Sequence, residues 1–454
     1  MNTARLTAII LAVLLLSSTL LSFPSVLRAD PGGMTMICVP TDEMSLRAEP
    51  GLGDDILATL YCGDRVTWDG EQTDVNEVTY YHVLTADGIT GWIRAEFCVP
   101  VYFEYDDSLL GLVDPDEELY TYEMMKADLE TLCGTYPDIL SSAVIGQSLC
   151  GRDIYEVTLG NPEVPHHVML QSTIHAREYM NTQLVMRLIE YYAAYYDTGS
   201  WFGTSYRDLF ANTALHIVPM ANPDGVALCQ EGIGAVSEEY QALIRECYER
   251  DKMTLEFGED SMHDYTWIEH YKDEEYIRDG NAAFPSFEEY LQLWKANAAG
   301  VDLNRNFDAG WEALDQKKEP AYTDFKGSAP VSEPETQCLV AMAESRTYDC
   351  FLSYHSKGGL IYYDVEGNTA SNSAASAALA GTMQYATGYK PKETMKGIDV
   401  VLGGFGDWVQ LALDRPYVTL ECGRHPCPLA QYEFESIWIR YRESWAALAA
   451  SLNR

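Results

Sequence analysis

The amino-acid sequence predicts an α/β fold, in which helices cover a sheet, preceded by a small all-β barrel. The chain has 454 residues, too many for one compact core, so we expect roughly two or three domains. Between residues 34 and 101, short apolar runs alternate with turn residues, which is typical of a small barrel. From Tyr120 onward, strand patterns alternate with helix patterns, as expected for a sheet covered by helices.

The barrel is expected to consist of short strands joined by turns. The Asp87-Gly88 pair marks one such turn. The expected strands are residues 36–39, 44–51, 56–60, 65–68, 80–84 and 91–93. An acidic stretch, residues 102–119, is expected to link the barrel to the second unit.

The second unit is expected to span residues 120–454. Met124, Leu129 and Leu132 share one face of a predicted helix. Further helices are predicted at residues 180–192, 373–386 and 436–452, and strands at residues 167–173, 215–219, 350–354, 360–363 and 417–420. Residues 228–290 form an acidic, aromatic-rich insertion without a clear period. It is interpreted either as a lid or rim or as a surface excursion without a role.

The overall charge excludes one class of partner. Thirty basic and 69 acidic residues give a formal net charge of −39, which argues against nucleic acid because phosphate binding needs basic patches. The hydrophobic share of 47% excludes global disorder. We therefore expect a folded protein that attracts cationic groups.

Residues 1–29 are interpreted as a secretory signal peptide, because Arg5 precedes an apolar run that ends ahead of Ala29. An uncleaved anchor is the alternative, since the apolar run approaches the length of a membrane span. We expect an exported or cell-envelope protein without stable membrane insertion. Eleven cysteines in an exported chain permit disulfides, whose pairing the sequence leaves open.

Three side chains are candidate metal ligands. His175 and Glu178 follow an apolar strand and precede a helix, the place where α/β sheets expose functional groups. Imidazole and carboxylate suit zinc, and catalytic zinc sites use three protein ligands. His355, at the end of another apolar strand, is the best third candidate. Each of these signals is weak by itself, because such residues also occur as surface or core side chains.

The order of five motifs resembles the zinc carboxypeptidase family. These motifs are HAREYM, NPDG, GVDLNRNF, SYHS and VTLECG, and the resemblance covers roughly residues 120–454. It implies an α/β fold with a central mixed sheet flanked by helices. It also implies one zinc ion and a peptidase reaction without a covalent intermediate.

The resemblance assigns the central residues of the site. His175, Glu178 and His355 correspond to the metal ligands. Asp302 corresponds to the carboxylate that orients the first histidine, which fixes its tautomer. Glu421 corresponds to the general base that takes a proton from the attacking water.

The resemblance also assigns cationic and polar groups that contact the substrate. Arg177 corresponds to a group that binds substrate and helps to polarise the carbonyl. Asn304 and Arg305 correspond to the pair that grips a free carboxylate, which a guanidinium matches in geometry. Lys295 stands where digestive carboxypeptidases carry an arginine that stabilises the oxyanion. Lysine is expected to supply the same positive charge, but as a compact point charge rather than a planar fork of donors.

Two further departures concern the side-chain pocket. The tyrosine that digestive enzymes place before the general base is absent, because Asp399 stands there. The pocket floor is Gly406, which is expected to leave space, and Asp407 and Asp399 are expected to meet an amino group. The chain resembles instead the bacterial branch that cleaves γ-D-glutamyl–diaminopimelate bonds in peptidoglycan stem peptides.

The first unit resembles the bacterial SH3-like domain, whose opening and closing motifs match MSLRAEPG and GITGWI. The resemblance implies binding to the cell wall, and a spacer without a ligand is the alternative. Two other functions stay open. One is a metallocarboxypeptidase that removes C-terminal residues from ordinary peptides, and the other is a non-catalytic wall-binding protein.

Overall fold

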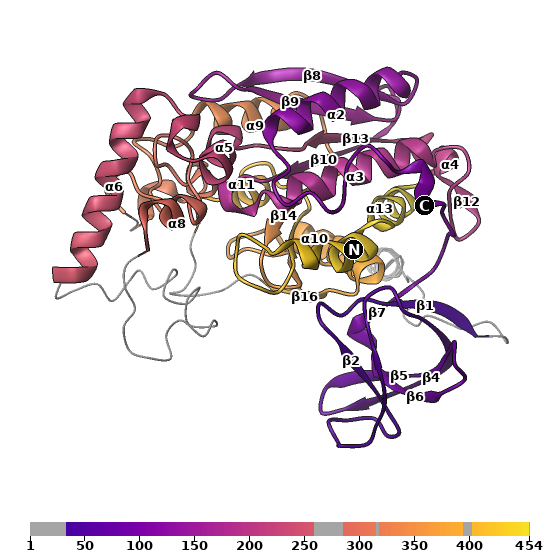
Figure 1. The fold of residues 1–454 in the computed structure, drawn as a ribbon. Coiled ribbons are helices and arrows are strands. Elements are labelled where there is room, and N and C mark those ends of the chain that lie inside the picture. The colour runs from indigo at the N-terminus through magenta and orange to yellow at the C-terminus, as the bar shows by residue number, and fades with distance from the viewer. Residues whose placement is uncertain (1–32, 258–284, 315–316, 394–401, 454) are drawn as a thin grey trace, which may run out of the picture.

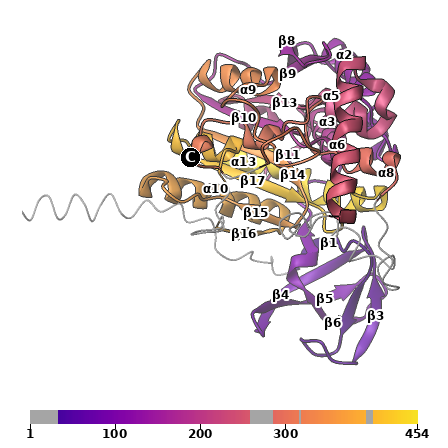
Figure 2. The same cartoon turned by 90° about the vertical axis from the view of Figure 1, so that its left-hand side faces the viewer.

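The computed structural model describes residues 33–257, 285–314, 317–393 and 402–453. The signal-peptide prediction and Asp399 lie outside these residues. Two views place a β-barrel at one end of a larger α/β domain (Figures 1 and 2). The predicted fold class is therefore confirmed. In the described part of the chain, no helix is both long and apolar enough to cross a membrane.

The barrel contains the six predicted strands and one more. They pair in the order β3-β2-β6-β5-β4-β1-β7, all antiparallel. Alternate side chains such as Leu46, Trp68, Val83 and Ile93 point inward and form the barrel core. The strands are β1 (Met34–Cys38), β2 (Met44–Arg47), β3 (Ile56–Leu60), β4 (Arg65–Val75), β5 (Val78–Thr85), β6 (Thr90–Arg94) and β7 (Cys98–Pro100).

The larger domain is built on an eight-stranded mixed sheet with the order β16-β15-β17-β14-β10-β13-β9-β8. Its centre, β17-β14-β10-β13, is parallel, whereas β9 and β8 pair antiparallel at one edge. The strands are β8 (Leu140–Gln147), β9 (Asp153–Leu159), β10 (His166–Ser172), β13 (Thr213–Val218), β14 (Cys350–Ser356), β15 (Leu360–Tyr362), β16 (Lys390–Lys392) and β17 (Tyr417–Cys422).

Helices cover both faces of this sheet, because successive side chains of each buried strand point to opposite sides. In β10, Val168 and Leu170 join one core cluster, whereas Met169 joins the other. The first face carries α2 (Tyr122–Thr135), α3 (Met180–Ala194), α10 (Ala370–Thr387), α12 (Phe434–Tyr441) and α13 (Ser444–Leu452). The second face carries α9 (Pro334–Glu344) and α11 (Phe405–Leu411).

Two predictions about the helices are wrong. In α2, Met125 rather than Met124 lies in the core beside Leu129 and Leu132. The segment 436–452 belongs to two helices rather than one. They are separated near Glu443, whose buried carboxylate accepts hydrogen bonds from two tyrosine hydroxyls.

The insertion 228–290 is more regular than its sequence pattern predicts. Its described parts contain the end of α5 (Pro223–Glu231), all of α6 (Glu238–Phe257) and the start of α8 (Phe287–Gln292). Ile244 and Cys247 of α6 pack on a cluster around Trp294. A short hairpin, β11 (Ser200–Trp201) with β12 (Thr204–Ser205), precedes α4 (Tyr206–Phe210) elsewhere in the domain.

The acidic segment between the two units packs against the larger one. The carboxylate of Glu190, on α3, accepts the backbone N–H groups of Gly111, Leu112 and Val113. Val113 is fully buried. All eleven cysteines are free thiols, so the disulfides that the composition permits are not formed in this structure.

Arg440, on α12, forms hydrogen bonds that connect the barrel to the α/β domain. Its guanidinium donates to the carbonyl oxygens of Val39 and Glu96 in the barrel, at 3.0 and 2.9 Å, and to that of Thr387 at 2.9 Å. Ser436 donates to the Val39 carbonyl as well, at 2.8 Å. The Arg440 side chain is fully enclosed between the two units.

Arg440→Met is expected to lower the free energy of unfolding by about 3 kcal/mol, because buried carbonyl groups lose charged donors. Arg207→Met, at an exposed ion pair with Asp197, is the control and is expected to change it by less than about 0.5 kcal/mol. Urea unfolding followed by circular dichroism measures both variants. Equal stability of the two variants would contradict a fastening role.

Candidate metal centre and active site

His175 and Glu178 are brought together by the turn that follows β10. Residues Ala176–Glu178 form a 3-10 turn, and the Glu178 N–H donates to the His175 carbonyl at 3.1 Å. This turn folds the chain back just before α3 begins. As a result, His175 Nδ1 lies 2.8 Å from Glu178 Oε1.

His355 reaches the same point from the neighbouring strand β14, which pairs with β10 in parallel. Its Nδ1 lies 3.1 Å from His175 Nδ1 and 3.1 Å from Glu178 Oε2. All three residues are at most 5% exposed. Parallel strands end at the same edge of a sheet, so residues far apart in sequence converge there.

This donor set fits a zinc ion. Two imidazole nitrogens and a carboxylate are a ligand set of catalytic zinc, and these atoms lie within 4.8 Å of one another. Burial lowers the pKa of His175, which favours the neutral imidazole that binds metal. Although burial acts to raise it, the two imidazoles hold the pKa of Glu178 well below its usual range, so this ligand is ionised.

Asp302 lies behind this centre, and its two carboxylate oxygens face His175 and Lys295. Its Oδ1 lies 3.5 Å from His175 Nε2, the ring nitrogen that faces away from Glu178. Its Oδ2 lies 3.5 Å from Lys295 Nζ. Although burial acts to raise it, Lys295 and His175 hold the pKa of Asp302 well below its usual range. A carboxylate in this position orients a metal-binding histidine.

Glu421 stands beside the centre on β17. It pairs in register with His355 across two parallel strands, so both side chains emerge on one side of the sheet. Burial raises the pKa of Glu421 to about 7, and His355 and Lys295 act in the opposite direction. A carboxylate with a pKa in this range can both accept and return a proton near neutral pH.

The centre opens into a cavity of about 420 Å³. Among the predicted site residues that the structure describes, Asp302 alone stays behind the cavity wall. The others line it: His175, Arg177, Glu178, Lys295, Asn304, Arg305, His355, Gly406, Asp407 and Glu421.

The pocket floor differs from the sequence expectation. Gly406 does not leave space, because a Cβ there would lie 2.1 Å from the ring of Tyr417, which fills that position. Asp407 is engaged at the start of α11, where its Oδ2 accepts the Gly404 N–H at 2.9 Å. Burial raises the pKa of Asp407 to about 6. The expectation that this carboxylate stands ready for an amino group is therefore weakened.

Sequence reasoning missed nine lining residues, and four of them are Lys357, Tyr362, Gln410 and Tyr417. Lys357 follows His355 by two positions, so its closeness to a candidate ligand was an available signal. The Tyr417 hydroxyl shares a hydrogen bond of 2.8 Å with the Thr419 hydroxyl. The other two come from β15 and α11, and only the tertiary fold brings them to the cavity.

A buried carboxyl group supports the loops behind the site. Glu335, at the start of α9, is fully buried and accepts hydrogen bonds from the Leu149 N–H and the Asn297 side chain. Burial raises its pKa to about 7, and the nearby carboxylates of Asp224 and Glu333 act in the same direction. Glu335 is therefore protonated in the folded protein at pH values where it ionises in the unfolded chain.

The stability that this proton confers is fully present below about pH 4.5 and is lost as pH rises through about 7. Glu335→Gln is neutral throughout. Its free energy of unfolding is expected to exceed that of the parent by an amount that grows from pH 5 to pH 8 and reaches up to about 3 kcal/mol. Free energies of unfolding at both pH values test this, with Glu344→Gln, an exposed residue of the same helix, as control. The same stability difference at both pH values would contradict the shift.

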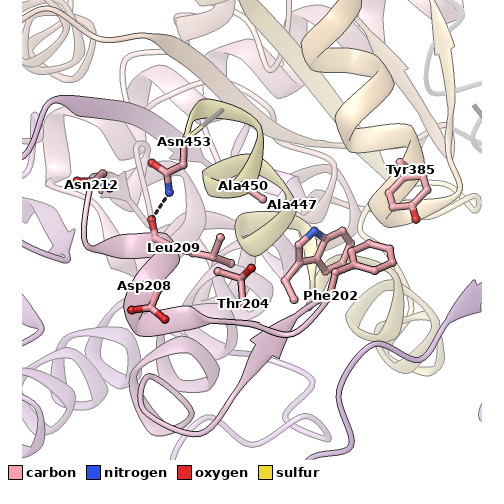
Figure 3. A pocket seen from close by; sticks show the side chains of 10 residues that line it. Phe202, Thr204, Asp208, Leu209, Asn212, Tyr385, Ala447, Ala450 and Asn453 are labelled. Atoms are coloured by element: carbon pink, nitrogen blue, oxygen red, sulfur yellow. Dashed lines mark hydrogen bonds between the residues drawn. The ribbon is translucent and has the colours of Figure 1, made fainter. Parts of the chain in front are cut away.

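A second cavity, of about 450 Å³, lies between the β11–β12 hairpin, α10 and α13. Figure 3 shows its aromatic wall, with Phe202 and Tyr385 at its rim. Its lining is mainly apolar and includes one carboxylate, Asp208. This composition does not fit a metal centre, so the catalytic site is assigned to the cavity at His175.

The zinc carboxypeptidase family model matches residues 125–426, and the bacterial SH3 domain model matches residues 42–98. Gamma-D-glutamyl-L-diamino acid endopeptidase 1 of Lysinibacillus sphaericus is 27% identical over 339 residues, which cover 74% of this chain and 73% of that protein. The uncharacterized protein YqgT of Bacillus subtilis is 28% identical over 330 residues, which cover 71% and 75%.

Among solved structures, thrombin-activatable fibrinolysis inhibitor has a TM-score of 0.54 at 16% identity, covering 78% of this chain and 84% of that chain. Carboxypeptidase A from Helicoverpa armigera has a TM-score of 0.50 at 21% identity, covering 77% and 80%. These likenesses show the fold. The family match extends over about two thirds of the chain and includes the convergent histidine and glutamate side chains. This chain belongs to the zinc carboxypeptidase family and is a zinc metallopeptidase.

Proposed function

We propose that this protein is an exported peptidase that hydrolyses the γ-D-glutamyl–diaminopimelate bond of peptidoglycan stem peptides. The observation that carries this proposal is the joining of one zinc peptidase site to a bacterial SH3 domain on a single chain. The similarity to an endopeptidase named for the γ-D-glutamyl-diamino acid bond supports the same substrate.

In this mechanism, His175, Glu178 and His355 hold the zinc ion, and Asp302 fixes the orientation of His175. A zinc ion here supplies Lewis acidity, which polarises the scissile carbonyl and lowers the pKa of water. Glu421 takes the proton of the attacking water and returns it to the leaving amine. Its partial burial beside His355 keeps its pKa near the pH at which both transfers are possible.

The remaining polar groups position the substrate. Arg305 and Asn304 bind the free carboxylate of diaminopimelate, because a guanidinium matches a carboxylate in shape and charge. Lys295 holds a positive charge beside the centre, 3.5 Å from Asp302, and stabilises the negative charge that develops on the carbonyl oxygen. The barrel holds the enzyme on the cell wall, and the N-terminal segment directs export.

The decisive experiment compares two substrate classes. The mature protein is incubated with stem tripeptides and tetrapeptides, and separately with ordinary peptides that differ in their C-terminal residue, and the products are identified by mass. Release of diaminopimelate or its short peptides, blocked by chelation, supports the proposal. Trimming of the ordinary peptides alone would show a general carboxypeptidase, a function that uses the same residues. Sedimentation of the full-length protein with purified cell walls tests the role of the barrel.

A further inference from the structure

The wall of the active-site cavity is rich in cations although the protein is strongly acidic. The chain has 30 basic and 69 acidic residues, yet four basic side chains line this one cavity. They are Arg177, Lys295, Arg305 and Lys357. Such a concentration of positive charge attracts an anionic substrate.

These four cations divide into two kinds. Lys295 lies 3.5 Å from Asp302, and Arg305 lies 3.9 Å from Asp324, so each has a carboxylate neighbour. Within the described part of the chain, Arg177 and Lys357 form no ion pair. The Arg177 guanidinium makes one long hydrogen bond of 3.5 Å, to the Leu293 carbonyl, and its Nε is buried without a described partner. A charged group left in this state is prepared to bind an anion.

Arg305 and Arg177 reach the cavity wall from different elements of the fold. Asn304, next to Arg305, accepts the Phe405 N–H at 2.9 Å, which places this pair against the start of α11. Arg177 lies in the turn between two metal ligands, and Lys357 follows the third ligand, His355, by two positions. Both side chains line the cavity. Arg177 and Lys357 therefore lie near the metal ligands, on other elements than the one that carries Asn304 and Arg305.

We propose that Arg177 and Lys357 form a carboxylate subsite on the acyl side of the scissile bond, which recognises the free α-carboxylate of a γ-linked glutamyl residue. This inference rests on the proposed function. A γ-linked glutamate keeps its α-carboxylate free beside the bond that is cut, whereas an ordinary α-linked residue has an amide in its place. Arg305 and Asn304 then hold the carboxylate of the leaving residue, and the subsite holds that of the acyl residue. The positive charge of Arg177 and Lys357 thereby selects for a γ-linked glutamyl residue.

The test uses two stem tripeptides that differ in one group, L-alanyl-γ-D-glutamyl-diaminopimelate and its analogue with the glutamyl α-carboxylate amidated. The parent is expected to prefer the carboxylate substrate by about tenfold in kcat/KM, the effect of one charge-assisted hydrogen bond. Lys357→Met is expected to remove this preference, mainly through KM, because cleavage of the carboxylate peptide falls toward that of the amidated peptide. Lys126→Met, on α2, is the matched control and keeps the preference. Zinc content is measured for every variant.

The outcomes separate the two proposals. Equal cleavage of both peptides by the parent, or an equal loss of both in Lys357→Met, overturns the subsite while the proposed function stands. Failure to cleave either γ-linked peptide, together with trimming of ordinary peptides, overturns the proposed function and the subsite with it. Loss of preference confined to Lys357→Met supports the subsite.

Discussion

Glu421→Gln is expected to lower kcat by about a thousandfold or more while zinc content stays at the parent level. The amide keeps the size of the side chain but cannot accept the proton of the attacking water. Glu421 lies on β17, beside the metal-ligand group. The donor atoms of that group, which are within 4.8 Å of one another, belong to His175, Glu178 and His355 and do not include Glu421. Metal binding is therefore expected to survive the change.

The measurement joins steady-state kinetics to metal analysis of the same samples. Glu130→Gln, at an exposed position on α2, is the matched control and is expected to behave as the parent. Retained activity would remove Glu421 from the mechanism. Loss of zinc in Glu421→Gln would instead assign it to the metal, which its place in the structure does not suggest.

The metal centre could be predicted because its residues occupy strand ends. His175 follows β10 and His355 ends β14, and neighbouring parallel strands deliver their ends to the same edge of a sheet. Glu421 obeys the same rule on β17. Local pattern and the order of motifs therefore carried enough information to bring these residues together.

Contacts between distant segments account for what the sequence did not reveal. Tyr417 fills the space beside Gly406 because β17 packs against the start of α11, a contact that no local pattern encodes. The break before α13 depends on a buried carboxylate, Glu443, which bonds to Tyr191 and Tyr206 from another part of the chain. The face of α2 was misplaced by one residue because Met124 and Met125 are adjacent and equally apolar.

Charge composition does not show how the linker 102–119 packs. This segment is rich in carboxylates, and its backbone N–H groups bond to Glu190 of α3. Backbone donors are present in every sequence, so composition gives no warning that a buried carboxylate will gather them.

His355→Ala is expected to release zinc and abolish activity, in contrast to Glu421→Gln. Removal of one of three donors leaves His175 and Glu178 facing each other across 2.8 Å, with too few ligands for a tetrahedral site. Zinc affinity is expected to fall by more than about a hundredfold, since loss of groups that only orient ligands already costs about 10–100-fold. Metal content after dialysis, and titration with a competing chelator, measure this change.

A histidine elsewhere in the same sheet provides the control for that variant. His166→Ala, at the start of β10 where the imidazole lies 3.3 Å from Asp349, removes an equal volume and an ion pair but no metal donor. It is expected to keep zinc and activity. If His355→Ala holds zinc as tightly as His166→Ala does, the three-ligand centre is wrong. If it loses zinc while circular dichroism stays that of the parent, the sheet forms without the ion, and the metal serves the reaction rather than the fold.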